Sequence, residues 1–481
     1  MMTEMWPRVE AALNLVGTSN ALSRRPPEDY RPLVPESPMG NILGFQFQPD
    51  SSSREPQSGE LRFFRCAGSG RELLLGLPGL TAADGLPAPH VVLMSGTSWA
   101  GTSTRYHVLT EVGAILSPPQ DELDAIDRTT FTPCFLKDAA GKPLKLSGAK
   151  PHLRPRVLEQ MLSQLARPRP DGSASPMQAE LAAIGDDSRR RLLLLTGSYD
   201  EARRAADYLE TIERWAGRVC RLVSDDAEQD HLWREAAHAP STRRGAPGAL
   251  RRGDVATFAE TGAEVLVAPL LAIERGHNIL NDEGTAAIGS VFFLARPHPR
   301  PDDIGLAIQA VNDWAARMLR DGSFRELVRD EDTLDAAGKE FRHQARAKWR
   351  HLLNQPMAYS RLGEEEKASF TWDQLVVIWQ VIGRLVRGGV PARVVFVDAP
   401  FAERQARGLS GDTAETSLLA SMLHVLAPYC GDSEPPSGGS PVPALDRVLV
   451  TTLYKPLYTA LSRLFPASEA APAAITHLET S

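Results

Sequence analysis

Four residues in the stretch WQVIGRLVR, at positions 379–387, have types and a spacing that suit the handling of a triphosphate. Gln380, Gly383, Arg384 and Arg387 form the pattern Q-x-x-G-R-x-x-R. On a helix, the glutamine and the two arginines follow one another by four and three residues, so we expect them to share one face. Arginine is permanently charged and can bind phosphate oxygens through two nitrogens at once. The pattern therefore predicts that Arg384 and Arg387 stabilise charge on a phosphoryl group during its transfer.

The same stretch also fits an amphipathic helix whose two arginines are solvated, and these residues alone leave both interpretations open. Under the first interpretation, Gly383 lets a neighbouring backbone or a ligand approach closely. That interpretation also requires Arg384 and Arg387 to face the cleft edge at which the strands of residues 191–397 end. Arginines that point into open water, away from this edge, would contradict it.

Three further segments carry small, hydroxyl-bearing or charged residues at or after the end of an apolar, strand-like run. They are LMSGTSWAG at 93–101, LLLLTGSYDEARRAADYLE at 192–210 and EVLVAPLLAIERGHNI at 264–279. Side chains at the carboxyl ends of parallel strands are well placed to contact a ligand. The residues of interest in these segments are Ser95, Gly96, Thr97, Thr196, Ser198, Tyr199, Arg275, Gly276 and Asn278.

Taken in chain order, the four segments resemble motifs III, IV, V and VI of superfamily 2 helicases, and most of all the DinG/XPD-like group. The stretch SGTSWAGTSTRYHV at 95–108 is also similar in sequence to the DinG-type helicase of prokaryotic PIWI-RE gene islands. The resemblance covers residues 88–405 approximately. It implies a C-terminal, ATP- and nucleic-acid-binding lobe of an ATP-dependent DNA helicase or translocase.

The resemblance also implies a role for each matching residue. Arg384 and Arg387 would be catalytic, and the nucleotide-binding residues would be Gln380, Gly383, Gly276 and Asn278. Residues that contact nucleic acid or couple two lobes would be Ser95, Thr97, Thr196, Ser198, Tyr199 and Arg275. Simpler alternatives remain open, since Ser198 also suits a helix N-cap and Arg275 a solvated loop.

A phosphate-binding P-loop of the form G-x-x-x-x-G-K-[ST] is absent from the 481 residues. Our first hypothesis is that ATP and Mg²⁺ are bound together with a P-loop-bearing lobe or subunit, which also supplies the magnesium ligands, and that the assembly moves along single-stranded DNA. The second is a non-catalytic accessory module of an anti-invader defence system, which binds nucleic acid, a PIWI-like protein or a nuclease. A nucleotide-binding transferase with a similar lobe is a third.

The composition gives no overall signal for nucleic acid, because the net charge is −7. Local arginine clusters must carry any such binding. They lie in the loop 238–253 and on a helical stripe of Arg342, Arg346 and Arg350, which could contact phosphates or simply be solvated. Trp99, Trp349 and Trp379 could stack on bases, although core packing suits them better.

Neither a secretion signal nor an apolar run of membrane-spanning length is recognisable, so we expect a cytoplasmic protein with no membrane partner. The four cysteines form no C-x-x-C pair, and we expect reduced thiols. The histidines show no H-E-x-x-H spacing, so the sequence predicts no metal site.

Short apolar strands alternating with helices predict an α/β fold, a RecA-like doubly wound parallel sheet. The expected strands are 191–196, 218–223, 264–269, 290–294 and 392–397, and the expected helices are 156–166, 199–216, 302–319, 340–354 and 372–386. We also expect a hairpin of 61–66 with 72–77, a buried strand at 90–97 and a strand at 448–453. The predicted organisation is an irregular segment 1–60, the incomplete end of a first lobe at 61–154, a C-terminal lobe at 155–410 with a helical insertion at about 305–370, and a linker with a strand and helix at 411–481.

Overall fold

A computed structural model describes residues 41–49, 59–67, 74–79, 85–224, 248–273, 278–297, 304–354, 359–431 and 442–465. The chain divides into two compact units. The smaller unit comprises Met1–Ser95, Val108–Glu111 and Pro299–Met357, and the larger unit comprises Gly96–His107, Val112–His298 and Ala358–Ser481. Each unit is described by itself.

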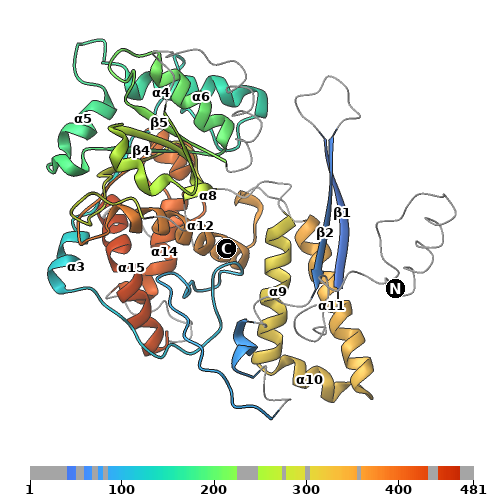
Figure 1. Ribbon diagram of the computed structural model, residues 1–481. Coiled ribbons are helices and arrows are strands. Elements are labelled where there is room, and N and C mark those ends of the chain that lie inside the picture. Colours follow the sequence, from blue (N-terminus) through green and yellow to red (C-terminus); the bar gives the residue numbers. More distant parts are fainter. Residues whose placement is uncertain are drawn as a thin grey trace, which may run out of the picture. The chain divides into compact units, whose positions relative to one another are not determined.

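The larger unit is built around a seven-stranded sheet in which every strand pair is parallel (Figure 1). The strand order across the sheet is β3 (Thr130–Pro133), β9 (Arg393–Phe396), β8 (Ser290–Phe293), β4 (Leu192–Thr196), β7 (Val265–Pro269), β5 (Val219–Val223) and β6 (Gly248–Arg251). The predicted α/β fold with a doubly wound parallel sheet is therefore confirmed.

Both faces of this sheet are covered by helices, which explains the continuous apolar runs in the sequence. Leu192 and Leu194 of β4 lie in one hydrophobic cluster, and Leu193 and Leu195 lie in the other. The first cluster includes side chains of α4 (Arg154–Ala166), α5 (Pro176–Ala183) and α6 (Tyr199–Glu210). The second includes side chains of α12 (Glu364–Leu385), α14 (Leu418–Cys430) and α15 (Ala444–Leu464). In Figure 1, α4 and α6 lie on one side of the strands, and α12, α14 and α15 on the other.

Shorter elements complete the larger unit. They are α3 (Gln120–Ile126), η4 (Pro151–Leu153), η5 (Asp187–Arg189), η6 (Val255–Thr261), α8 (Leu270–Ile273), η7 (Tyr359–Arg361), η8 (Ala399–Phe401) and α13 (Glu403–Ala406). Within the described residues of the whole chain, no helix has the length and apolar character needed to cross a membrane.

The smaller unit contains an antiparallel strand pair and a group of helices. The strands are β1 (Asn41–Pro49) and β2 (Gly59–Ala67), and the helical elements are η2 (Leu77–Gly79), α9 (Ile304–Arg320), α10 (Ser323–Asp330) and α11 (Leu334–Asn354). The helices α9, α10 and α11 share a core around Phe341, which packs against Trp314 and Phe324. They occupy most of the helical insertion expected at about 305–370, and α10 was not predicted.

Several expected strands differ in the structure. Residues 61–66 do form a strand, but it pairs with 41–49, inside the segment expected to be irregular, and not with 72–77. Residues 85–97 form no strand; Val92 is 82% exposed and Met94 83% exposed, so the predicted burial is wrong. An apolar run becomes a strand only where a neighbouring strand offers its hydrogen bonds, and this segment has no such neighbour among the described residues.

Three further expectations are corrected in the larger unit. Residues 448–453 belong to the helix α15, which tolerates Pro456 within it. The loop 238–253 ends in a strand, because 248–251 pairs with β5 and forms the edge of the sheet. Helix α12 begins at Glu364, eight residues before the predicted start, where three glutamates favour the positive end of the helix dipole.

Candidate nucleotide-binding site

One face of α12 carries polar side chains and is covered by the segment 96–107 of the same unit. Gln380 Nε2 donates a hydrogen bond of 2.8 Å to Thr97 Oγ1. Two turns earlier on the helix, Asp373 Oδ1 accepts a bond of 2.5 Å from Ser103 Oγ. The segment therefore runs antiparallel to α12 along this face. It brings together Thr97 and Gln380, two predicted site residues that lie 283 positions apart.

Aromatic packing holds the covering segment in place. The Trp99 ring lies edge-on to Trp372 of α12, with 5.7 Å between the ring centroids, and it also contacts Tyr429 of α14. The hydroxyl of Tyr454 donates a bond of 2.8 Å to the Trp99 carbonyl. Gly101 has a φ of +49°, and a Cβ there would lie 2.3 Å from the Trp372 ring. The segment can thus follow α12 closely only with a glycine at 101.

The structure also shows how the three tryptophans considered for base stacking are packed. Trp99 packs among core rings, and Trp379 donates its Nε1–H to the Leu453 carbonyl at 3.0 Å while packing against the same core. Trp349 packs against the core of the smaller unit. These contacts fit core packing, the interpretation that the sequence favoured.

The two arginines take different places at the end of α12. Arg384 is half-buried on the helix, one turn after Gln380. Arg387 is exposed and lies beyond the last helical residue, Leu385, so helical periodicity no longer places it on the shared face. The helix stops here because Gly388 and Gly389 adopt φ values of +78° and +68°.

The end of α12 lies at the edge of the sheet where the strands begin. The carbonyl of Arg387 accepts a hydrogen bond of 3.0 Å from the N–H of Ala286, which shortly precedes β8. Arg393, six residues on, is the first residue of β9. The expectation that the arginine pair faces the edge where the strands end is therefore wrong, because α12 runs antiparallel to the strand that follows it.

A buried arginine that the sequence reasoning missed fixes this end of the helix. Arg189 is 5% exposed, and its guanidinium donates to the carbonyls of Ala286 at 2.8 Å, Leu385 at 2.9 Å and Pro391 at 3.0 Å. It thereby joins the last turn of α12 to the segments that lead into β8 and β9. Burial lowers the pKa of Arg189. The only signal in the sequence was a run of three arginines before β4, which does not say which one is buried.

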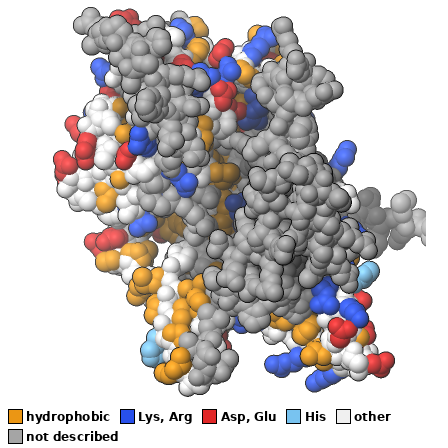
Figure 2. Space-filling model, turned by 45° about the vertical axis from the view of Figure 1, so that its right-hand side comes forward, with side chains coloured by type: hydrophobic (Ala, Val, Ile, Leu, Met, Phe, Trp, Pro, Cys, Tyr) orange, Lys and Arg blue, Asp and Glu red, His pale blue; other side chains and the backbone are white. Residues whose placement is uncertain are grey.

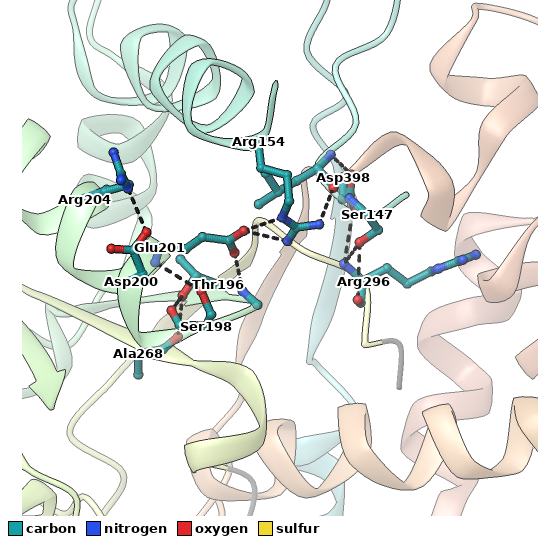
Figure 3. Close-up of polar contacts among 12 residues, drawn as sticks. Ser147, Arg154, Thr196, Ser198, Asp200, Glu201, Arg204, Ala268, Arg296 and Asp398 are labelled. Atoms are coloured by element: carbon teal, nitrogen blue, oxygen red, sulfur yellow. Dashed lines mark hydrogen bonds and ion pairs between the residues drawn. The ribbon is translucent and has the colours of Figure 1, made fainter. Parts of the chain in front are cut away.

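The residues expected to bind phosphates at the end of β4 are engaged in local structure (Figure 3). The Thr196 side chain is fully buried, and its Oγ1 donates to the Ser198 carbonyl at 3.1 Å. Ser198 Oγ accepts the N–H of Glu201 at 3.2 Å, so Ser198 is the N-cap of α6. Tyr199 is the first residue of that helix and packs against the core.

Next to this cap, an ion pair joins α6 to the first residue of α4. Arg154 and Glu201 are 2.6 Å apart, and the Glu201 side chain is 8% exposed. The second oxygen of Glu201 accepts the Gly197 N–H at 2.8 Å, and Arg154 Nη1 donates to the Leu146 carbonyl at 2.8 Å. Figure 3 shows these contacts converging at the carboxyl edge of the sheet, which is the edge where the parallel strands end. The carboxylate thus takes the N–H that an anion would otherwise use at the start of α6.

A buried carboxylate completes the carboxyl edge. Asp398 follows β9 and is fully buried, and it accepts backbone N–H bonds from Leu146 at 2.8 Å and from Ser147 and Arg296 at 3.0 Å (Figure 3). Burial raises the pKa of Asp398, and these hydrogen bonds lower it in part. These bonds hold residues 144–154 against the ends of β8 and β9, so Asp398 has a structural role.

The predicted site residues therefore fall into separate groups. Thr97, Gln380, Gly383 and Arg384 lie on or against one face of α12, whereas Thr196, Ser198 and Tyr199 lie at the carboxyl edge. Asn278 is exposed and precedes the buried Ile279. Arg275 and Gly276 lie outside the described residues, and Ser95 belongs to the smaller unit.

Comparisons with known proteins add no relative to this picture. No family model matches the chain, and no curated protein or solved structure is significantly similar to it.

Proposed function

We propose that this chain forms the C-terminal, ATP- and nucleic-acid-binding lobe of an ATP-dependent DNA helicase or translocase. A P-loop-bearing lobe, on another segment or polypeptide, would complete it. The contact between Gln380 and Thr97 carries the proposal, because it joins a residue of the motif VI-like stretch to one of the motif III-like stretch. A parallel α/β sheet around which both stretches fold is the architecture such a lobe needs.

The surroundings of Gln380 and Gly383 suit a phosphate-bearing ligand. Among the described residues, no atom lies within 4 Å of a Cβ built on Gly383, so packing within the chain does not demand a glycine there. A glycine inside a helix costs about 1 kcal/mol relative to alanine. Gln380 Oε1 is buried and accepts no hydrogen bond from any described residue. A ligand beside this face would use both the open space and the spare acceptor.

ATP with Mg²⁺ would supply the phosphoryl group that is transferred, and the magnesium ligands would come from the P-loop lobe. Arg384 and Arg387 would bind the phosphates and stabilise the charge that develops on them. An arginine acting on a nucleotide held by another lobe must be reachable from outside its own lobe. Arg387 is exposed, but it lies at the edge where the strands begin and not at the edge that the sequence interpretation required. The proposal therefore needs the P-loop lobe to approach the C-terminal end of α12.

The test is ATP hydrolysis with and without single-stranded DNA, by the chain alone and by its assemblies with the products of neighbouring genes. We expect no turnover from the chain alone and DNA-stimulated turnover from the assembly. Arg387→Ala should lower the turnover of the assembly by about 10³-fold without changing the thermal unfolding of the chain. Arg190→Ala, which removes another exposed arginine of the larger unit, is the matched control.

Two results would count against the proposal. Wild-type turnover in the Arg387→Ala assembly would reject the role of this arginine. DNA binding with no hydrolysis in any assembly would favour the accessory module, which needs no nucleotide chemistry.

A further inference from the structure

The helices of the smaller unit carry their charges unevenly. The second half of α11, residues 342–354, contains no carboxylate and has four cationic side chains: Arg342, Arg346, Lys348 and Arg350. By contrast, α10 and the turns around it carry more acids than bases, namely Asp321, Glu326, Asp330, Glu331 and Asp332 against Arg325 and Arg329. The positive charge is therefore concentrated on one helix.

Most of these cations point away from the core of the unit. Phe341 and Ala345 are buried against the neighbouring helices, and on a helix the side opposite them carries His343, Arg346 and Arg350. All three are exposed, and Arg342 beside them is half-buried. We call the surface formed by Arg342, His343, Arg346 and Arg350 the cationic face of α11. Figure 2 shows Lys and Arg side chains on the helices of this unit, at the lower right of the view.

The cationic face is only weakly offset by its own helix, on which Asp335 interacts electrostatically with Arg342. In the part of the chain that the structure describes, no carboxylate lies within ion-pair distance of Arg342, Arg346 or Arg350. Other helical cations of this protein have such a partner one turn away: Lys339 with Asp335 at 2.8 Å, and Arg203 with Asp200 at 2.7 Å. Like charges four residues apart destabilise a helix by about 0.2–0.5 kcal/mol per pair, and the dipole at the helix C-terminus offsets part of this.

The spacing of the cationic face matches a chain of phosphates. Arg342 and Arg350 are eight residues apart, which is about 12 Å along a helix. One strand of a duplex rises about 3.4 Å per nucleotide, so this length covers three to four phosphates. Guanidinium groups bind phosphate oxygens through two parallel hydrogen bonds, which ammonium groups cannot do. Three arginines in a row therefore fit a linear polyanion better than a single acidic group.

We propose that the cationic face of α11 binds the phosphate backbone of a nucleic acid strand, without reading its sequence. The contact deepens the proposed function by assigning it a DNA-binding surface in the smaller unit, but it requires neither ATP nor a second lobe. The net charge of −7 means that the chain as a whole repels nucleic acid, so binding must depend on such a local array.

The experiment measures the binding of the full chain to a fluorescent 20-nucleotide oligo-dT by anisotropy, over a range of salt concentrations and without ATP. The test variant is Arg346→Ala with Arg350→Ala. Its matched control is Arg325→Ala with Arg329→Ala, which removes two exposed arginines at the same four-residue spacing from α10. Circular dichroism and thermal unfolding verify that both variants fold.

We expect the test variant to bind at least tenfold more weakly at low salt, and the control to stay within twofold of the parent chain. The slope of log Kd against log salt should fall by about 1.4 in the test variant, since each lost phosphate contact on a single strand contributes about 0.7. Lysine at both positions should restore only part of the binding, because it returns the charge but not the paired hydrogen bonds.

Unchanged affinity and an unchanged salt slope in the folded test variant would overturn the inference. So would a variant that still binds oligo-dT but loses binding to vesicles containing phosphatidylserine, because the face would then serve a membrane surface. Since no ATP is present, the result is separate from the hydrolysis test, and either proposal can fail without the other.

Discussion

The guanidinium of Arg189 donates a hydrogen bond of 2.9 Å to the carbonyl of Leu385, the last residue of α12. With its bonds to Ala286 and Pro391, this single side chain closes the ends of three segments that meet at the amino edge of the sheet. It also holds the helix end from which Arg384 and Arg387 project. Arg189 is thus a positioning residue of the candidate site as well as a structural one.

Replacing Arg189 by methionine should lower the free energy of unfolding by about 3 kcal/mol, because several buried carbonyls lose their donor. Denaturant unfolding followed by tryptophan fluorescence measures the change. The neighbouring Arg190 is exposed; it pairs with the exposed Asp187 and makes one long hydrogen bond of 3.5 Å to the Ile184 carbonyl, so Arg190→Met should cost no more than about 1 kcal/mol. Equal losses for the two variants would show that the Arg189 hydrogen bonds are unimportant.

Gly383→Ala should stabilise the chain by about 0.5–1 kcal/mol, because alanine favours the helix and finds open space. If the glycine leaves room for a ligand, the same variant should lower the ATP turnover of the complete assembly. Chemical denaturation and the hydrolysis assay test the two parts in parallel. A more stable variant with unchanged turnover would remove Gly383 from the site.

The hydrogen bond between Gln380 and Thr97 should appear as a coupling energy in a double-mutant cycle. We expect the losses of unfolding free energy in Gln380→Ala and Thr97→Ala to be non-additive by about 1 kcal/mol, since either change alone breaks the same bond. Purely additive losses in urea unfolding would mean that the covering segment is not held by this contact.

Gly101→Ala should destabilise the larger unit by about 2 kcal/mol or more, because the new Cβ meets the Trp372 ring in a backbone conformation that alanine disfavours. The change should also alter the near-ultraviolet circular dichroism of the packed tryptophans. Gly96→Ala is the matched control, because no described atom lies within 4 Å of a Cβ there. Similar melting temperatures for both variants would contradict the close approach.

Burial raises the pKa of the Cys220 and Cys430 thiols to about 11. Because the thiolate is the reactive form, at pH 8 only about one molecule in a thousand carries it at either position. We therefore expect slow labelling of both by iodoacetamide in the native protein, faster labelling as the pH approaches 11, and rapid labelling in denaturant. Peptide mass spectrometry resolves the two sites. Fast labelling of either at pH 8 without unfolding would show that it is not buried.

Much of the sheet could be predicted because its information is local. The run LLLLT at 192–196 has four leucines in succession, and a strand carries apolar residues on both sides only when both of its faces are covered. The cap at Ser198 is equally local, since its hydroxyl bonds an N–H three residues on. The strand predicted at 90–97 is wrong because that prediction used only local information. The run has the composition of a strand, but no described strand lies beside it to pair with.

The amino-acid sequence by itself therefore determined the class of fold, the central strands of the sheet and the residues that form the candidate motifs. Tertiary structure alone decided that Thr97 meets Gln380, that Arg189 closes the end of α12, and that the arginine pair lies at the amino edge. The contacts behind these three findings join residues 101 to 283 positions apart, so no local periodicity or propensity encodes them. They follow only when helices and strands have packed and the buried polar groups must find partners.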